Sequence, residues 1–250
     1  MRLSARTVGP EGGTPVTFLH GFTQTGDSWS PVVAGLRGVR ATLVDAPGHG
    51  SNAQHTPGLW ETARAVADVM PRGVLVGYSM GARMALHVAL VAPGNVTALV
   101  LVSGTPGIED EAERVVRRAA DDTLADRIEE IGSARFVDEW LANPMFAGLP
   151  EEHAQRSARA ANPAAGLAGS LRSAGTGTQD NLWPRLGEIT CPVLVVTGML
   201  DAKFAVIGER MAAALPRADL RCIAGAGHTV HLEKVDDFCS ALSDWFSTLR

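Results

Sequence analysis

Short runs of apolar residues recur along the chain and alternate with segments of helical periodicity. The runs are rich in Val, Leu and Thr, and they lie at 16–21, 41–46, 74–79, 98–104, 192–198 and 220–225. Apolar residues fill these runs without alternating with polar ones, which is typical of strands buried on both faces. The pattern therefore predicts an α/β fold, with a mostly parallel central sheet that helices cover on both faces.

Helical patterns separate these strands, and one long helical stretch interrupts the alternation. The predicted helices lie at 28–36, 59–70, 80–92, 205–215 and 233–248. From 106 to 187 the strand pattern disappears, and charged helical segments take its place. Because α/β folds bind ligands at the carboxyl ends of their strands, such an insertion can form a cap that selects the substrate. We therefore expect a core made of 1–105 and 188–250, with a helical cap at 106–187.

The composition fits a globular protein with a sizeable core. Of the 250 residues, 46% are hydrophobic and 20% are charged. The formal net charge of -5 gives no electrostatic reason to expect a nucleic-acid partner. The N-terminal stretch lacks the apolar region of a signal peptide, and no run of about 18 apolar residues could span a membrane. We therefore predict a cytoplasmic protein with neither a nucleic-acid nor a membrane partner.

The cysteines and the other metal-binding residue types show no pattern of a disulfide or a metal site. Cys191, Cys222 and Cys239 are widely spaced and stand in apolar surroundings, so we expect buried thiols. No group of His, Cys, Asp and Glu has the spacing of metal ligands. We expect no bound metal.

The stretch Gly77-Tyr78-Ser79-Met80-Gly81 joins a predicted strand directly to a predicted helix. It matches G-x-S-x-G in the strand-turn-helix context that this motif requires. The turn forces its serine into a strained backbone conformation, and the glycines remove side chains that would clash there. We therefore expect the hydroxyl of Ser79 to project into a cleft as a catalytic group, and not to be an incidental turn residue.

A serine hydroxyl reacts only when an imidazole, itself oriented by a carboxylate, takes its proton. In this fold the three residues follow the chain order Ser, Asp or Glu, His. Asp201 and His228 each follow a predicted strand, and they complete a predicted triad with Ser79. His231 is the competing base, which we interpret as a helix residue. Three competing carboxylates are interpreted as turn or helix-surface residues, namely Asp219, Asp236 and Asp237. A fourth, Asp45, also ends a strand, but it precedes Ser79 and so has the wrong chain order.

Backbone amides should stabilise the oxyanion that forms during the reaction. The expected donors are the N–H groups of Met80, directly after the serine, and of Phe22, in the loop after the first predicted strand. His20 and His49 stand in or near glycine-rich loops, and we interpret them as residues that shape these loops by hydrogen bonding.

Arg83 stands four residues after Ser79, so a helix that starts at Met80 places both on nearly the same face. A cation in the first turn of a helix faces an unfavourable macrodipole. The position therefore indicates a ligand anion beside the serine, with an ion pair to a nearby carboxylate as the alternative.

Several segments, spread over nearly the whole chain, are specific to fewer protein families than the G-x-S-x-G motif is. They are LHGFTQTGDSW, VDAPGHGSN, GYSMGAR, WLANPMFAGL, RAANPAAGLAGSLRSAGTGTQDNLW, GMLDAKF and AGAGHTVHLE. Together they resemble the 2-succinyl-6-hydroxy-2,4-cyclohexadiene-1-carboxylate synthases, lyases of menaquinone biosynthesis with the α/β-hydrolase fold. One mild departure is Ala82, where relatives often have a second glycine.

The resemblance implies a cofactor-independent elimination of pyruvate from a cyclohexene that carries several carboxylates. It implies a triad of Ser79, Asp201 and His228. The substrate-binding residues that it implies are Tyr78, Arg83, Arg117, Trp140 and Arg159. Arg118 adjoins Arg117 and is the alternative at that position. Arginine suits such a substrate, because its planar fork binds carboxylates in bidentate fashion.

Two other functions remain open from the sequence. A serine hydrolase acting on a small carboxylated ester or carbon–carbon bond would use the same triad through an acyl-enzyme. A ligand-binding receptor on this fold is disfavoured, because all three triad positions are filled. The expected partner is a small polycarboxylate molecule, and the sequence leaves monomer and homo-oligomer open.

Overall fold

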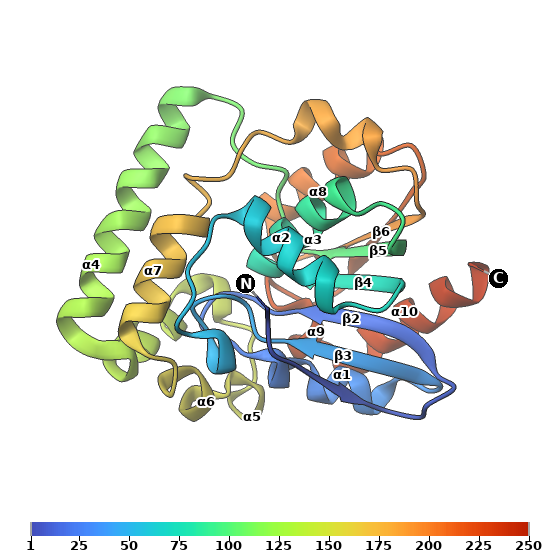
Figure 1. Ribbon diagram of the computed structural model, residues 1–250, viewed down its shortest axis with the longest axis horizontal. Helices are drawn as coiled ribbons and strands as arrows, with labels where there is room; N and C mark the ends of the chain where they lie inside the picture. The colour runs from blue at the N-terminus through green and yellow to red at the C-terminus, as the bar shows by residue number, and fades with distance from the viewer. Residues whose placement is uncertain (1, 250) are drawn as a thin grey trace.

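A seven-stranded β-sheet runs through the centre of the protein in the computed structural model, which describes residues 2–249 (Figure 1). In spatial order the strands are β1-β3-β2-β4-β5-β6-β7, and all neighbours are parallel except β1 and β3. Their bounds are Ala5–Val8 for β1, Thr14–Leu19 for β2, Val39–Val44 for β3, Gly73–Tyr78 for β4, Val96–Val102 for β5, Val193–Gly198 for β6 and Ala218–Ile223 for β7.

Each predicted strand is present, and most begin one or two residues earlier than the apolar run suggested. The edge strand β1 was not predicted. It is four residues long and mostly exposed, and it is antiparallel to β3, so it carries no apolar run. The prediction of a mostly parallel sheet is confirmed.

Helices cover both faces of the sheet, because successive strand residues point to opposite faces. Leu75, Leu99 and Val193 pack on one side with helices α2 and α3 and with Met211 of α8. Residues of β2, β4, β5 and β6 that point the other way pack with α1 and α10. The helix bounds are Ser30–Gly35 for α1, Leu59–Val69 for α2, Met80–Val91 for α3, Ala202–Ala214 for α8 and Val235–Thr248 for α10.

Shorter helical turns complete this part of the chain. They are η1 (Gly26–Trp29), η2 (Gly50–Asn52) and α9 (Val230–Glu233). The predicted helix at 28–36 is therefore split between η1 and α1, and α8 begins three residues before the predicted start at 205. Asp201 caps α8 by accepting a hydrogen bond from the Phe204 N–H at 3.3 Å.

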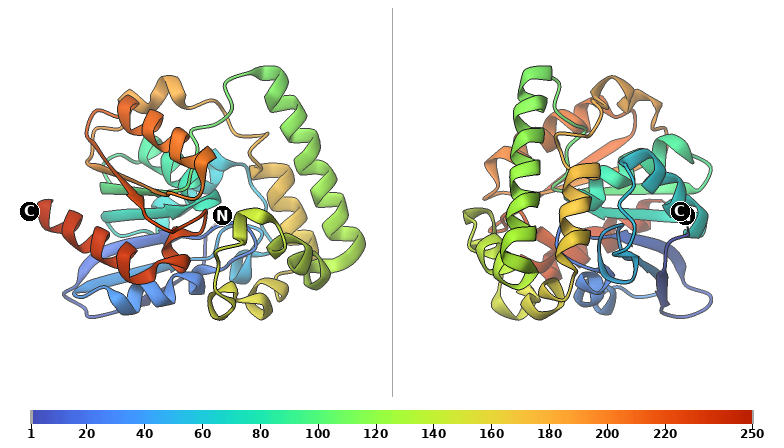
Figure 2. Two further views of the ribbon diagram at one scale, coloured as in Figure 1. Left: turned by 180° about the vertical axis from the view of Figure 1, so that it is seen from behind. Right: turned by 60° about the vertical axis from the view of Figure 1, so that its left-hand side comes forward.

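All elements between β5 and β6 are helical. They are α4 (Glu111–Leu141), η3 (Pro144–Phe146), α5 (Glu151–Ala154), α6 (Arg156–Ala160), α7 (Ala164–Ala174) and η4 (Trp183–Glu188). In Figures 1 and 2, α4 and α7 stand side by side away from the sheet, with α5 and α6 beneath them. The long helix α4 bends at Gly132, whose φ of 76° favours glycine.

The structure corrects one prediction about the thiols. Cys239 is buried, but Cys191 is only partly buried and Cys222 is exposed. Cys222 lies on β7, an edge strand whose residues are partly exposed, so an apolar run there did not mean burial on both faces. Among residues 2–249, no helix is long and apolar enough to cross a membrane.

Candidate active site

Ser79 occupies the sharp corner between β4 and α3. Its backbone has φ 51° and ψ -107°, a conformation that residues other than glycine rarely adopt. A Cβ at Gly77 would lie 2.3 Å from the Gly81 carbonyl oxygen, and one at Gly81 would lie 2.2 Å from that of Leu19. Both glycines are therefore needed for the corner, which holds the serine at the floor of a cavity.

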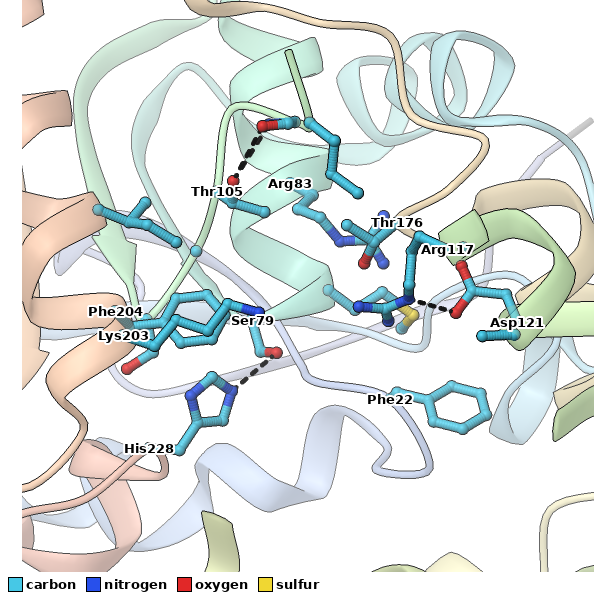
Figure 3. Close-up of a pocket in the computed structure, with 18 of the residues that line it drawn as sticks. Phe22, Ser79, Arg83, Thr105, Arg117, Asp121, Thr176, Lys203, Phe204 and His228 are labelled. Carbon is cyan, nitrogen blue, oxygen red and sulfur yellow. Dashed lines mark hydrogen bonds and ion pairs between the residues drawn. The ribbon is translucent and has the colours of Figure 1, made fainter. Parts of the chain in front are cut away.

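His228 lies within hydrogen-bond distance of both Ser79 and Asp201, in the order that a catalytic triad requires. The His228 Nε2 atom is 3.1 Å from Ser79 Oγ (Figure 3), and Nδ1 is 2.6 Å from Asp201 Oδ2. An ionised carboxylate only accepts, so Nδ1 carries the proton and Nε2 is free to accept from the serine hydroxyl. This arrangement can activate the serine oxygen as a base or as a nucleophile.

The competing histidine His231 lies elsewhere. Its ring is fully buried between Trp29, with ring centroids 4.3 Å apart, and Tyr78, at 4.4 Å. Burial lowers its pKa well below the ordinary value, so it stays neutral. His231 therefore packs beneath the site, and the geometry places His228 alone beside the serine.

The loop after β2 carries Phe22, one of the two predicted oxyanion donors, and Phe22 lines the same cavity as Ser79. Met80 begins α3, so its N–H belongs to the first turn, where amides have no carbonyl partner within the helix. The neighbouring Thr23 has φ 68° and is held by Asn162, which donates to its carbonyl oxygen at 2.7 Å. A residue of the segment 106–187, the predicted cap, thus fixes the loop that carries Phe22.

His20 and His49 support this loop from below. His20 Nε2 accepts from the Ala46 N–H at 2.8 Å, and His49 Nε2 accepts from the Thr23 N–H at 3.2 Å. Both side chains are fully buried, and this desolvation lowers the pKa of His20 to about 4 and that of His49 to about 3. The interpretation of both as loop-shaping residues is confirmed.

The cavity above Ser79 has a volume of about 1060 Å³ and is lined by residues of the segment 106–187, the predicted cap, and by residues outside it. His228 and Asp201 line it from outside this segment, and Trp140 lines it from within. Trp140 also packs against Phe22, with ring centroids 5.4 Å apart. The cavity is therefore closed on one side by an aromatic contact between the cap and the predicted oxyanion loop.

Two of the predicted arginines reach the cavity wall. Arg83 is only 7% exposed and donates to the Ala174 carbonyl oxygen at 2.8 Å, and burial lowers its pKa to about 10. Among the described residues it forms no ion pair with a carboxylate, so the alternative of a structural ion pair is wrong. Arg117 lines the cavity, whereas its neighbour Arg118 does not.

Arg117 is held by a carboxylate that the sequence did not single out. Asp121, one helical turn later, accepts from Arg117 Nε at 2.8 Å and from the Gly177 N–H at 2.9 Å. A Cβ at Gly177 would lie 2.2 Å from the Arg118 backbone nitrogen, so the 175–177 turn packs directly on α4. Figure 3 shows Arg83 and Arg117 on the same side of the cavity.

The other predicted substrate residues lie behind the wall. Arg159 is 1% exposed, and it donates to Thr23 Oγ1 at 2.5 Å and to the Ala154 carbonyl oxygen at 2.8 Å. Tyr78 is 3% exposed and shares a 3.1 Å hydrogen bond with the Thr229 hydroxyl. In this structure neither side chain lines the cavity, and both instead support the loops that do.

Lys203 on α8 is a cavity-lining cation that the sequence analysis missed. It is exposed, its Nζ atom lies 5.7 Å from the centroid of the Phe204 ring, and that centroid lies 4.6 Å from the centroid of the His228 ring. It is one of only two lysines in the chain and stands two residues after Asp201, and this position next to a predicted triad residue could have identified it from the sequence. Arg210 also lines the cavity, but it is paired with Glu109.

No group of three or more His, Cys, Asp or Glu side chains in residues 2–249 is arranged to hold a metal ion.

Residues 18–241 match the model of the alpha/beta hydrolase family. The 2-succinyl-6-hydroxy-2,4-cyclohexadiene-1-carboxylate synthase of Serratia proteamaculans is 30% identical over 91% of each chain. A Bacillus subtilis protein that provisionally bears the same name is 36% identical, over 100% of this chain and 96% of the relative. The chain belongs to this synthase family.

Solved structures agree with membership in the synthase family. MenH from S. aureus superposes with a TM-score of 0.92 at 30% identity, over 98% of each chain. An esterase from Thermogutta terrifontis superposes with a TM-score of 0.84 at 23% identity, which shows a shared fold. The prediction of an α/β-hydrolase fold and the resemblance to the synthases are both confirmed, and the chain spans more than nine tenths of the two synthase relatives and of MenH.

Proposed function

We propose that this synthase eliminates pyruvate from 2-succinyl-5-enolpyruvyl-6-hydroxy-3-cyclohexene-1-carboxylate to give 2-succinyl-6-hydroxy-2,4-cyclohexadiene-1-carboxylate in menaquinone biosynthesis. The observation that carries this proposal is one cavity that holds both an assembled triad and two arginines, Arg83 and Arg117. Family membership supplies the substrate. The reaction is redox-neutral, so it needs no electron carrier.

The reaction moves one double bond and forms another. The substrate has a ring double bond at C3, and the product has two, at C2 and C4. The proton at C2, next to the succinyl carbonyl, must therefore leave as the C5–O bond to the enolpyruvyl group breaks. The electron pair of the C–H bond forms the C2–C3 double bond, the electron pair of the C3–C4 double bond moves to C4–C5, and the electron pair of the C5–O bond leaves with the enolpyruvyl oxygen. The departing enolate then takes up a proton to become pyruvate.

Each triad residue has a role in this step. Asp201 holds the Nδ1 proton of His228, so that Nε2 can take the proton of the Ser79 hydroxyl. The Ser79 oxygen then removes the C2 proton and acts as a base without becoming acylated. Negative charge develops on the succinyl carbonyl oxygen, and we assign its stabilisation to the N–H groups of Phe22 and Met80.

The cations orient the substrate. Arg83 and Arg117 bind substrate carboxylates on the side of the cavity away from His228, and Lys203 offers a third positive charge near the triad. We assign Arg159 and Tyr78 to the support of the Phe22 and Thr229 loops. Residues 106–187 act as the cap that carries Arg117 and Trp140 to the substrate.

The test is to supply the enolpyruvyl substrate to the purified protein and measure the pyruvate released. A neutral p-nitrophenyl ester is assayed in parallel, because a serine hydrolase with the same triad would accept it. We expect stoichiometric pyruvate and little ester cleavage. Ester hydrolysis through an acyl-enzyme, with no pyruvate released, would establish the hydrolase instead.

A further inference from the structure

The carboxylate of Glu233 binds the backbone on both sides of the triad histidine. Its Oε2 atom accepts from the Gly227 N–H at 2.6 Å, and its Oε1 atom accepts from the Thr229 N–H at 2.8 Å. His228 lies between these two amides. Both oxygens of one side chain therefore fix the peptide segment from which the imidazole projects.

Among the described residues, no hydrogen bond other than those to Glu233 is found for the N–H groups of Gly227 and Thr229. α9 is only four residues long, and the turn before it contains two glycines, Gly225 and Gly227. Among residues 2–249, Glu233 forms no ion pair with a cationic side chain, so its hydrogen-bonding capacity serves the loop. Hydrogen bonds from amides to a carboxylate are charge-assisted and shorter than neutral ones, so they hold the backbone firmly.

The cap packs against this clamp. A Cβ at Gly148 would lie 2.3 Å from Glu233 Oε2, and the Nδ1–H of His153 donates to the Leu232 carbonyl oxygen at 2.8 Å. The segment from η3 to α5 therefore abuts the carboxylate at the end of the cavity that holds His228. Only glycine at 148 leaves the carboxylate where it is.

We propose that Glu233 is a positioning residue for the triad. It sets the distance between His228 Nε2 and Ser79 Oγ by clamping the amides of Gly227 and Thr229. Glu233 does not line the cavity, so it acts on the reaction only through His228. This proposal rests on the proposed function for its turnover assay, but a second assay below does not need that substrate.

The first test compares Glu233→Gln with Asp237→Asn. The glutamine keeps the size of the side chain but has one acceptor oxygen, so its NH2 group must face one of the two N–H donors. We expect kcat to fall roughly 10- to 100-fold with KM unchanged, because a displaced catalytic group costs that much. Asp237→Asn removes the same charge from an exposed position on α10 and should leave kcat unchanged.

The second test leaves Glu233 in place. Gly148→Ala should push the carboxylate away from the loop and lower kcat in the same direction as Glu233→Gln. Gly187→Ala is the matched control, since a Cβ there meets nothing within 4 Å. If Glu233→Gln fails to fold, this variant still decides the proposal.

The third test measures how fast a fluorophosphonate modifies Ser79, which requires the Ser79–His228 contact but no enolpyruvyl substrate. We expect slower modification in both variants and an unchanged Tm. Wild-type rates of modification and turnover in the folded variants would overturn the proposal, and so would a kcat loss that merely follows a loss of Tm. Absence of pyruvate release by the wild type would count against the proposed function alone, because the phosphonate rates would still judge Glu233.

Discussion

Arg83 at the cavity and Arg172 on the surface of the helical segment 106–187 have different surroundings. Arg83 is almost fully buried and bonds to a carbonyl oxygen. Arg172 is partly exposed and contacts two carboxylates, Asp126 at 2.6 Å and Glu129 at 2.8 Å. Desolvation lowers the pKa of Arg83, whereas hydrogen bonds from the carboxylates raise that of Arg172. The surface cation is neutralised by carboxylates of the protein, whereas the buried one has no carboxylate partner among the described residues.

Ion pairs like those of Arg172 are common around α4, and two other arginines that line the cavity are also paired, Arg117 with Asp121 and Arg210 with Glu109. The outer face of α4 and its neighbours has a network of ion pairs that includes Arg127 with Glu130 and Glu139. Exposed pairs of this kind contribute little to stability, because water and salt screen them. At the cavity, by contrast, a charge without a carboxylate lowers stability and is expected only where a ligand benefits. Five variants or conditions break or sharpen this comparison.

The largest effect is expected in the triad. Ser79→Ala should lower turnover by about 1000-fold or more, because the triad residues act as a unit. The measurement is the rate of pyruvate release, with Tm as the control for folding. The double variant Ser79→Ala with His228→Ala should be no slower than the single one. A further multiplicative loss would show that His228 works independently of Ser79.

Arg83→Ala tests whether the buried cation serves the ligand. It should reduce kcat/KM on the carboxylated substrate by roughly 2 to 5 kcal/mol in transition-state stabilisation, since a substrate anion would lose its partner in a desolvated site. Any weak cleavage of a neutral ester should change little. Equal losses on both substrates would mean that Arg83 only maintains the shape of the cavity.

Acid should weaken the core loops. His20 and His49 have folded-state pKa values of about 4 and about 3, below the ordinary value of 6.5. The unfolded chain therefore binds more protons below pH 6.5, and stability falls as the pH drops from there toward 4 and 3. We expect urea midpoints that decline over this range. His49→Gln should flatten the decline, and an unchanged slope would assign the acid sensitivity to other groups.

Arg159→Ala separates support of a loop from contact with substrate. Arg159 holds the loop that carries Phe22, so its loss should reduce activity on the carboxylated substrate and on the neutral ester by similar factors, on the order of 10-fold. The ratio of the two kcat/KM values is the measurement. A loss confined to the carboxylated substrate would show that Arg159 grips the substrate directly.

The smallest effect is expected on the surface. Arg172→Ala removes a cation from an exposed ion-pair cluster, so Tm should shift by no more than about 4 °C, with kcat/KM unchanged. Thermal unfolding followed by circular dichroism gives the shift. A larger shift would show that the cap depends on its ion pairs more than exposed pairs normally allow.

The sequence predicted those features that depend on local pattern. Buried parallel strands appear in the sequence as apolar runs. The G-x-S-x-G motif identifies Ser79 within a stretch of five residues. Asp201 and His228 could then be predicted, because each follows a strand and the two occur in the chain order of a triad. The short edge strand β1 was not predicted, because it is mostly exposed and has no apolar run. Cys222 was wrongly predicted to be buried, because β7 lies at the other edge of the sheet and is partly exposed.

Other features depend on contacts between distant segments. Asp121 binds Gly177, 56 residues away, and Arg159 reaches Thr23 across 136 residues. No local periodicity records such contacts. Glu233 is close in sequence to His228, but its role appears only when both of its oxygens are seen to face the amides of Gly227 and Thr229.

The burial of Arg83 has a consequence for how the enzyme responds to its solution. Dissolved ions screen exposed charges over about 8 Å at physiological ionic strength, but they reach a buried guanidinium poorly. Arg83 has already lost most of its hydration in the folded protein, whereas Lys203 keeps its own. Added salt should therefore weaken the attraction of the substrate to Lys203 at the cavity wall, while the proposed contact of Arg83 with a substrate carboxylate should persist. Ionic strength would then slow the arrival of the substrate more than it loosens the complex.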